Sequence, residues 1–247
     1  FEEFADRVAE LVEKHVNINR LLELTKPVAT AVVPISAGRH IYKREPSFPI
    51  AVACDPAFNF VYEANIRYLH HLGEVTYFSP LADTSLPDAG FVYLPGGYPE
   101  LYLAALSANR QMLQSIRRYV ESGGKLLAEC GGMMYLCDEI RDKNGYVYPM
   151  AGVLHQSATM ENMKLRLGYR TLLYNETRLK GHEFHYSRLV EQQNPLPSCA
   201  VAYTAKGVET DTPLYHYKNV WAGYTHLYWA DPVGNEWFTK FVIDGNT

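Results

Sequence analysis

Apolar runs of strand length alternate with amphipathic stretches between residues 49 and 140. Strands are expected at 49–55, 74–80, 90–97 and 125–129. Helices are expected at 58–72, at 108–122 with Ser107 as N-cap, and at 131–140. Because strands that alternate with helices indicate βαβ units, this region predicts a mostly parallel central sheet flanked by helices.

Residues 146–247 have a different pattern, richer in β-branched and aromatic residues and in turns. They predict short strands near 165–174, 182–190, 200–206, 213–218 and 220–226, then a terminal helix at 233–243. The two halves together predict an α/β fold whose C-terminal half adds β-strands to the parallel core.

The residues before 48 form neither pattern. Residues 1–24 are expected to be an amphipathic helix, and 25–47 hold three prolines and a basic cluster that indicate a connector. We interpret the cluster as a solvated linker surface rather than a binding patch. The chain is therefore predicted to divide into residues 1–47 and a main domain at 48–247.

Composition narrows the class of protein. The net charge of -4 gives no basic field for nucleic acid. No run of 18 apolar residues occurs, and the acidic start is unlike a signal peptide, so neither a membrane span nor export is expected. The four cysteines form no CxxC pair and are expected to be reduced in a cytoplasm, where one of them can be a nucleophile.

The candidate nucleophile is Cys130, in KLLAECGGMMYL. An apolar strand ends at this cysteine, two glycines follow at once and a helix is expected next, as in a nucleophile elbow. We expect the helix N-terminus to lower the pKa of the Cys130 thiol, and the N–H of Gly131 to bind the oxyanion of a tetrahedral intermediate. A second strand, in GFVYLPGGYPE, ends at Gly96 and Gly97, which should lie at the same sheet edge and complete the oxyanion hole.

A cysteine nucleophile needs a base, and His226 at the end of the apolar strand in VWAGYTHLYWA is the expected one. His182 and His185, in GHEFHYS, remain competitors. Their HxxH spacing invites a metal interpretation. No third ligand is evident, however, and two such side chains face opposite sides of a strand, so no metal site is predicted.

These motifs resemble a known family. ECGG, PGG and the late THxY are similar to the class I (triad-type) glutamine amidotransferases, which have a flavodoxin-like core. More narrowly, LPGGYPE, AECGGMMYL, GHEFHYS and GYTHLYW resemble the C-terminal glutaminase domain of the cobyrinic acid a,c-diamide synthase family, over about residues 49–243.

The resemblance implies that Cys130 attacks the side-chain amide of glutamine with help from His226, and that ammonia leaves from a thioester intermediate. Gly97 and Gly131 would be the oxyanion donors. The ammonia would pass to a preceding synthetase domain that uses ATP and Mg²⁺ to amidate the a and c carboxylates of cobyrinic acid, a corrinoid precursor. No GxxxxGK[ST] occurs in this chain, so no cofactor is expected in it. Residues 1–47 resemble the last helix of that synthetase domain and its linker.

Two positions depart from the class I pattern. Tyr228 stands where many members have Glu, and Met134 where many have Gln. A Cys–His dyad is therefore favoured over a triad, with Glu183 as an alternative carboxylate. His185 and Tyr186 could line the site, but support of the sheet is the favoured role.

Two alternatives remain at this point. The same glutaminase chemistry could serve another acceptor, such as a nickel tetrapyrrole or a cell-wall lipid precursor. The chain could instead be a catalytically silent binding module, which Tyr228 and Met134 would support. The intact set of Cys130, its glycines and His226 favours an enzyme.

Overall fold

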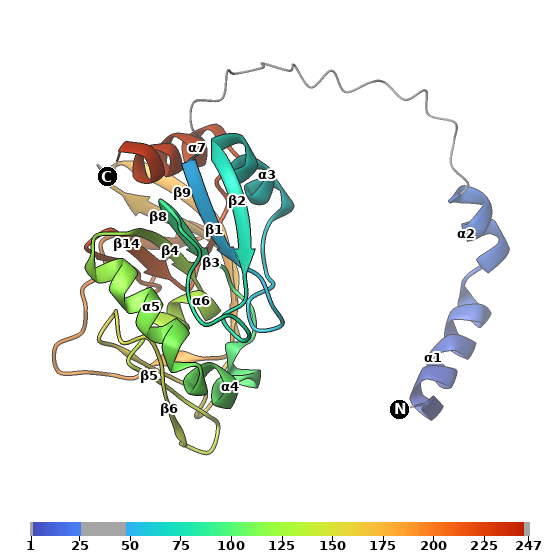
Figure 1. Cartoon of the computed structure of the whole chain (residues 1–247). Coiled ribbons are helices and arrows are strands. Elements are labelled where there is room, and N and C mark those ends of the chain that lie inside the picture. The colour runs from blue at the N-terminus through green and yellow to red at the C-terminus, as the bar shows by residue number, and fades with distance from the viewer. Residues whose placement is uncertain (1, 26–47, 245–247) are drawn as a thin grey trace. The chain divides into compact units, whose positions relative to one another are not determined.

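The structure is a computed structural model that describes residues 2–25 and 48–244 (Figure 1). By its internal contacts the chain divides into two compact units, residues 1–44 and 45–247. The first holds α1 (Glu2–His15) and α2 (Ile18–Leu24) instead of the single helix expected at 1–24. Asn17 interrupts that helix because its side chain caps α2, accepting a hydrogen bond from the Arg20 N–H at 2.9 Å. Most of the predicted connector lies outside the described residues, and the synthetase origin of residues 1–47 stays a prediction.

A six-stranded sheet forms the centre of the second unit. Its order is β13-β14-β4-β3-β1-β2, and all neighbouring pairs are parallel except β13 with β14. The mostly parallel sheet predicted from the apolar runs is confirmed. The strands are β1 (Phe48–Ala53), β2 (Gly73–Phe78), β3 (Phe91–Leu94), β4 (Lys125–Glu129), β13 (Leu214–Tyr217) and β14 (Val220–Gly223).

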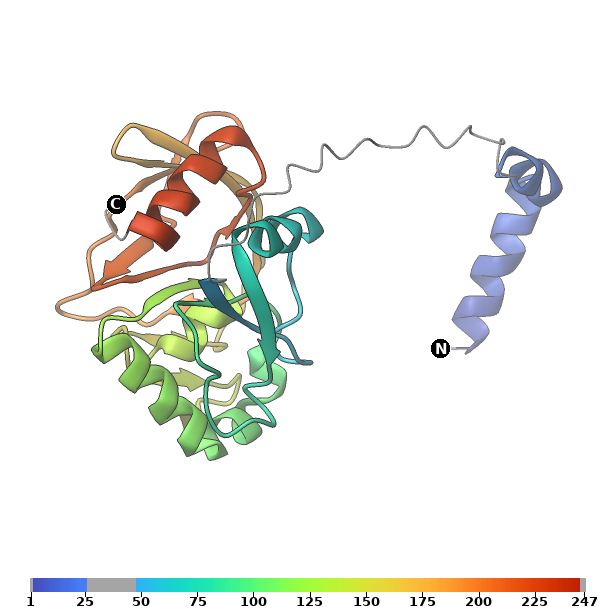
Figure 2. The same ribbon diagram turned by 45° about the horizontal axis from the view of Figure 1, so that its top comes forward.

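Helices cover both faces of this sheet, as Figures 1 and 2 show. On one face, α4 (Leu103–Ala108), α5 (Arg110–Glu121) and α6 (Gly131–Leu136) contribute to one buried apolar cluster. On the other face, α3 (Glu63–Leu72) and α7 (Pro232–Thr239) contribute to a second cluster. A 3-10 turn, Pro99–Leu101, precedes α4, and a π-helical turn, Lys240–Asp244, extends α7.

Two smaller sheets are built from the added strands. A four-stranded sheet has the order β10-β7-β5-β6, and a five-stranded sheet has the order β12-β11-β8-β9-β15. The first comprises β5 (Glu139–Arg141), β6 (Val147–Pro149), β7 (Ser157–Thr159) and β10 (Arg188–Leu189). The second comprises β8 (Arg166–Tyr174), β9 (Thr177–His185), β11 (Val201–Thr204), β12 (Glu209–Thr210) and β15 (His226–Leu227).

Several expected helix bounds were wrong. The helix expected at 108–122 is α5, preceded by the separate short helix α4, and Asn109 rather than Ser107 caps α5, with its side chain accepting from the Met112 N–H. The helix expected from 58 begins at Glu63, because Phe60 pairs with Gly96 in an isolated β-bridge. The helix expected to reach 140 ends at Leu136, and β5 follows it.

Two expected strands were also placed wrongly, and both changes shape the site. The strand expected at 182–190 is β9, which starts at Thr177 and pairs along its whole length with β8. The strand expected at 220–226 stops at Gly223 in the central sheet, and β15 then joins β9. This change of sheet places His226 opposite His182.

Candidate active site

Cys130 occupies a strained turn between β4 and α6. Its backbone has φ 48° and ψ -105°, and its N–H donates to the Gly223 carbonyl at 2.7 Å. A positive φ at a non-glycine residue costs on the order of 1–3 kcal/mol and is retained mainly at functional sites. Gly132 makes the turn possible, because a Cβ there would lie 2.1 Å from the Leu94 carbonyl oxygen. The local geometry is that of the predicted nucleophile elbow.

A pocket of about 250 Å³ opens over this turn. It brings together three residues expected at the site from widely separated motifs, Cys130, Gly97 and His226. Both reactive side chains are almost fully buried, with 4% of Cys130 and 3% of His226 exposed. The rest of the wall is Phe60, Tyr98, His182 and Phe184.

Neighbouring rings confine the His226 imidazole. It stacks on His182 at a centroid distance of 4.9 Å and meets the edge of Phe60 at 4.6 Å. A hydrogen bond joins His182 Nδ1 to the Tyr62 hydroxyl. Gly96 also lies against the His226 ring, because a Cβ on Gly96 would lie 2.2 Å from His226 Cε1. Gly96 therefore gives His226 its space, a role different from the oxyanion contact expected for it.

The His226 Nδ1 atom is buried and has no hydrogen-bond partner among the described residues. The residue two positions later, Tyr228, is partly exposed and meets the ring of Tyr62. None of the described residues that line the pocket carries a carboxylate, and the Cys–His dyad stays a prediction.

Gly97 and Gly131 lie side by side at the elbow. A Cβ on Gly131 would stand 3.3 Å from the backbone nitrogen of Gly97. The Gly131 N–H is close enough to the Cys130 sulfur that its hydrogen bond lowers the pKa of the thiol. The Gly131 N–H thus adjoins the sulfur, and Gly97, which lines the same pocket as Cys130, lies next to Gly131. Backbone N–H groups in such a place can stabilise an oxyanion.

The expectation of a lowered Cys130 pKa was wrong. Burial, together with the charge of Glu100, raises the pKa of this thiol to about 12, and the Gly131 N–H only partly offsets that rise. Burial also lowers the pKa of His226 to about 3, helped by His182 and His185. The cause is desolvation, which disfavours both charged forms and outweighs the effect of a six-residue helix. The resting pair is a neutral thiol, which donates to the Phe184 carbonyl at 3.9 Å, and a neutral imidazole.

The remaining expected residues lie outside this pocket. Glu183, the alternative carboxylate for His226, forms an ion pair with Arg170 at 2.6 Å and does not line the pocket. His185 stacks on Tyr224 and, with Glu183, lines a separate cavity of about 600 Å³. Tyr186 is partly exposed and lines neither space.

The expected separation of His182 and His185 to opposite sides of one strand is confirmed, and His182, which the sequence had offered only as a competitor of His226, is the one that lines the pocket. The alternation along β9 sends His182 and Phe184 into the pocket and places their neighbours, Glu183 and His185, on the other side. Counting this alternation back from the motif would have identified His182. Phe60 and Tyr98 had no comparable signal.

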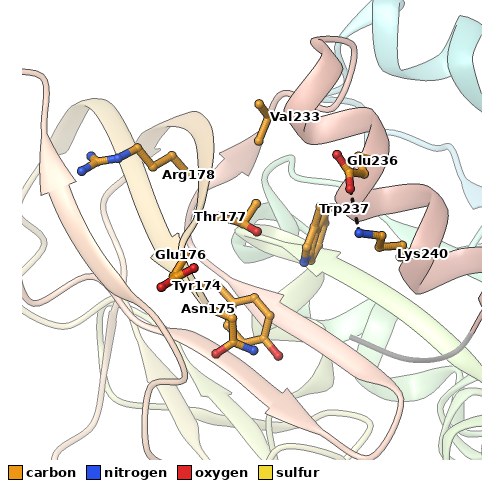
Figure 3. Close-up of a pocket in the computed structure, with 9 residues that line it drawn as sticks. All are labelled: Tyr174, Asn175, Glu176, Thr177, Arg178, Val233, Glu236, Trp237 and Lys240. Carbon is orange, nitrogen blue, oxygen red and sulfur yellow. Dashed lines mark hydrogen bonds and ion pairs between the residues drawn. The ribbon is translucent and has the colours of Figure 1, made fainter.

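A further hollow shares no residue with this pocket. A hollow of about 480 Å³ between the β8–β9 turn and α7 is lined by neither Cys nor His, and its Glu236 and Lys240 pair with each other at 2.7 Å (Figure 3). No cluster of three or more His, Cys, Asp or Glu side chains suited to a metal ion occurs in residues 2–25 and 48–244. Within the same residues, no helix is long and apolar enough to span a bilayer.

Comparison with known proteins identifies the family to which this chain is similar. The family of CobB/CobQ-like glutamine amidotransferase domains matches residues 49–233. A "Cobyrinate a,c-diamide synthase" from Picrophilus torridus is 37% identical over 90% of this chain and 49% of its own length. A "Hydrogenobyrinate a,c-diamide synthase" from Pseudomonas aeruginosa is 40% identical over 72% of this chain and 41% of its own length. The chain thus spans about half the length of the curated relatives that it matches.

Solved structures share the fold at low identity. A crystal structure of a glutamine amidotransferase covers 78% of this chain with a TM-score of 0.51 and 17% identity. The structure of PurLQS from Thermotoga maritima covers 80% with a TM-score of 0.51 and 16% identity. The predicted fold of class I glutamine amidotransferases is therefore confirmed.

Proposed function

The chain belongs to the family of CobB/CobQ-like glutamine amidotransferase domains, and from this premise we propose that it hydrolyses glutamine to glutamate and ammonia at Cys130. The observation that carries the proposal is one pocket lined by a strained cysteine, a histidine from another sheet and Gly97, with Gly131 next to both Cys130 and Gly97. That set supplies a nucleophile, a base and an oxyanion hole, the groups that acyl transfer requires.

Both reacting groups start neutral, so the thiol proton must move as the sulfur attacks. The Cys130 sulfur forms a bond to the side-chain carbonyl carbon of glutamine, while the imidazole of His226 takes the thiol proton. The N–H groups of Gly97 and Gly131 bind the oxygen that becomes negative. The carbon–nitrogen bond then breaks, and the imidazolium returns its proton to the departing nitrogen as ammonia. Water, deprotonated by His226, hydrolyses the thioester and releases glutamate and the free thiol.

The names of the relatives support a proposal for the acceptor of the ammonia. We propose that the ammonia serves ATP-dependent amidation of the a and c carboxylates of cobyrinic acid or of its hydrogenobyrinic counterpart. The chain has no phosphate-binding GxxxxGK[ST] loop, so ATP and Mg²⁺ are assigned to the half of the relatives that it does not span. That half would also bind the corrinoid precursor.

Glutamate release tests the proposal. We expect the 247-residue chain to release glutamate from glutamine, and a separately produced ATP-dependent half to raise the rate. Cys130→Ala should abolish release, and His226→Ala should lower kcat on the order of 10²-fold or more, as for loss of a general base. Cys137→Ala is the matched control, because that thiol is also buried but donates to the Met133 carbonyl within α6 and its neighbouring turn. Equal rates for wild type and Cys130→Ala would refute the proposal and favour a silent binding module.

A further inference from the structure

A buried carboxyl group stands directly before the elbow, and the mechanism above does not use it. Glu129 is the last residue of β4, and only 2% of it is exposed. We propose that Glu129 is a positioning residue that holds His226 in register with Cys130 through the backbone N–H of Leu227. The inference rests on the proposed function and names the group that replaces the missing triad carboxylate.

The contacts of Glu129 join three strands. The Tyr93 hydroxyl, from β3, donates to Oε2 at 2.7 Å, and the Leu227 N–H, from β15, donates to Oε1 at 3.0 Å. The Leu227 nitrogen shares its peptide plane with the carbonyl group of His226. A fixed Leu227 N–H therefore fixes the backbone from which the imidazole projects.

The strand that carries His226 needs this support. β15 has only two residues and pairs with a single strand, β9. Among the described residues, side chains provide the hydrogen bonds on its other side. Asn65 donates to the Leu227 carbonyl at 2.8 Å and accepts from the Trp229 N–H at 3.0 Å, while Glu129 accepts from the Leu227 N–H. Both side chains are buried, so water cannot replace them.

Ring packing confines the His226 imidazole, but no hydrogen bond from the described residues to Nδ1 fixes its orientation. Its Nδ1 has no hydrogen-bond partner among the described residues, and Tyr228 stands where a carboxylate would reach that atom in a triad. In a triad the carboxylate fixes the imidazole through a ring nitrogen. Here the carboxyl group acts one peptide away, through the main chain.

The surroundings make Glu129 costly to keep, which argues against an incidental role. It enters the apolar cluster that contains Tyr93, Leu127 and Trp229. Burial raises its pKa to about 7 even though the donors of Tyr93 and Leu227 lower it. An apolar residue here would avoid that cost but would leave the Leu227 N–H unpaired.

Three substitutions separate the hydrogen bond from the charge. Glu129→Gln keeps an acceptor at the same reach but removes the charge. Glu129→Asp keeps the charge but is one methylene shorter, which withdraws it from the Leu227 N–H. Glu129→Leu removes both. Tyr93→Phe is the matched control, because it deletes the other hydrogen bond of the same carboxyl group and leaves the Leu227 contact.

The readouts are kcat and KM for glutamate release by the 247-residue chain, together with the rate at which iodoacetamide alkylates Cys130. We expect the variants Glu129→Gln and Tyr93→Phe to keep kcat within about threefold of the wild-type value. The variants Glu129→Asp and Glu129→Leu should lower kcat by about 30-fold or more and change KM by less than about threefold, as for a displaced catalytic group. Alkylation of Cys130 should stay close to wild type in the Asp variant, which would locate the defect at the histidine.

The outcomes decide between the possible roles. The positioning role would be overturned if Glu129→Asp and Glu129→Leu both kept the wild-type kcat. It would also be overturned if Glu129→Gln were as slow as Glu129→Leu. Loss of thermal stability with unchanged kcat would assign Glu129 to structure alone. If the Leu variant does not fold, Asp against Gln still decides the question. A wild-type chain that releases no glutamate would refute the proposed function itself, whereas an active wild type with an equally active Asp variant refutes only this inference.

Discussion

Substitution of Gly96 by alanine tests the geometry around His226 with a single methyl group. The added Cβ would lie 2.2 Å from His226 Cε1 and 2.9 Å from Nδ1. Carbon atoms in contact stay about 3.5–4.0 Å apart, so the ring must move by more than about 1 Å. The imidazole cannot move freely, because His182 stacks on it and the edge of Phe60 packs against it.

A displacement of that size should be expensive for catalysis. A misplacement of about 1 Å at a catalytic group costs on the order of 10²-fold in rate, which corresponds to about 2.7 kcal/mol in activation free energy. We therefore expect Gly96→Ala to lower the kcat for glutamate release by about 10²-fold.

Gly90→Ala provides the matched control. Its Cβ would also clash, at 2.5 Å, but with the ring of Phe48 at the start of β1 and not with any residue that lines the pocket. The Gly90 variant should keep a near wild-type kcat and lose some thermal stability. A Gly96→Ala variant with wild-type kcat, or one no slower than the Gly90 variant, would refute the placement of His226 described here.

Three further predictions follow from burial and hydrogen bonding. The rate at which iodoacetamide alkylates Cys130, measured by peptide mass spectrometry, should rise about tenfold per pH unit from pH 6 to 10, because the pKa of the thiol is raised to about 12. A plateau below pH 8 would indicate a preformed thiolate–imidazolium ion pair instead. Asn65→Leu should reduce the free energy of unfolding, measured by urea denaturation, by about 2–5 kcal/mol, because it leaves the Leu227 carbonyl and the Trp229 N–H buried and unpaired. A loss below about 1 kcal/mol would contradict this prediction. The pKa of Glu129 is raised from 4.5 to about 7, so the folded state binds more protons than the unfolded state between these pH values. The free energy of unfolding should therefore fall by on the order of 3 kcal/mol as the pH rises through this range. In urea titrations Glu129→Gln should flatten this pH dependence, and an identical dependence in the variant would count against the buried carboxyl group.

The centre of the parallel sheet could be predicted because β1, β3 and β4 are largely apolar runs, the pattern that buried parallel strands require, whereas the edge strand β2 is partly exposed and has mixed polarity. The elbow could be predicted for a related reason, since a strand, a cysteine and two glycines are consecutive in sequence. Helix bounds were less certain, because they depend on single contacts. Asn109 caps α5, and the bridge from Phe60 to Gly96 delays α3, and neither contact is visible in a periodic pattern.

The walls of the pocket could be predicted only in part. Cys130, Gly97 and His226 each end an apolar segment, which marks them in the sequence. Phe60 reaches the pocket through its long-range pairing with Gly96, which sequence alone does not determine, whereas the alternation along β9 could have indicated His182. The charge state of the thiol was also beyond reach, because the nearby helix is visible in the sequence whereas the desolvation that dominates it exists only once the surrounding residues pack.

Direct detection of the covalent intermediate tests the central claim most sharply. The 247-residue chain is mixed with glutamine, quenched in acid within seconds and digested, and the peptides are analysed by mass spectrometry. A glutamyl group in thioester linkage on the peptide that contains Cys130, absent in Cys130→Ala and accumulating in wild type or His226→Ala, is the predicted result. Glutamate release without any adduct on Cys130, or an adduct on Cys54, Cys137 or Cys199 instead, would contradict the account.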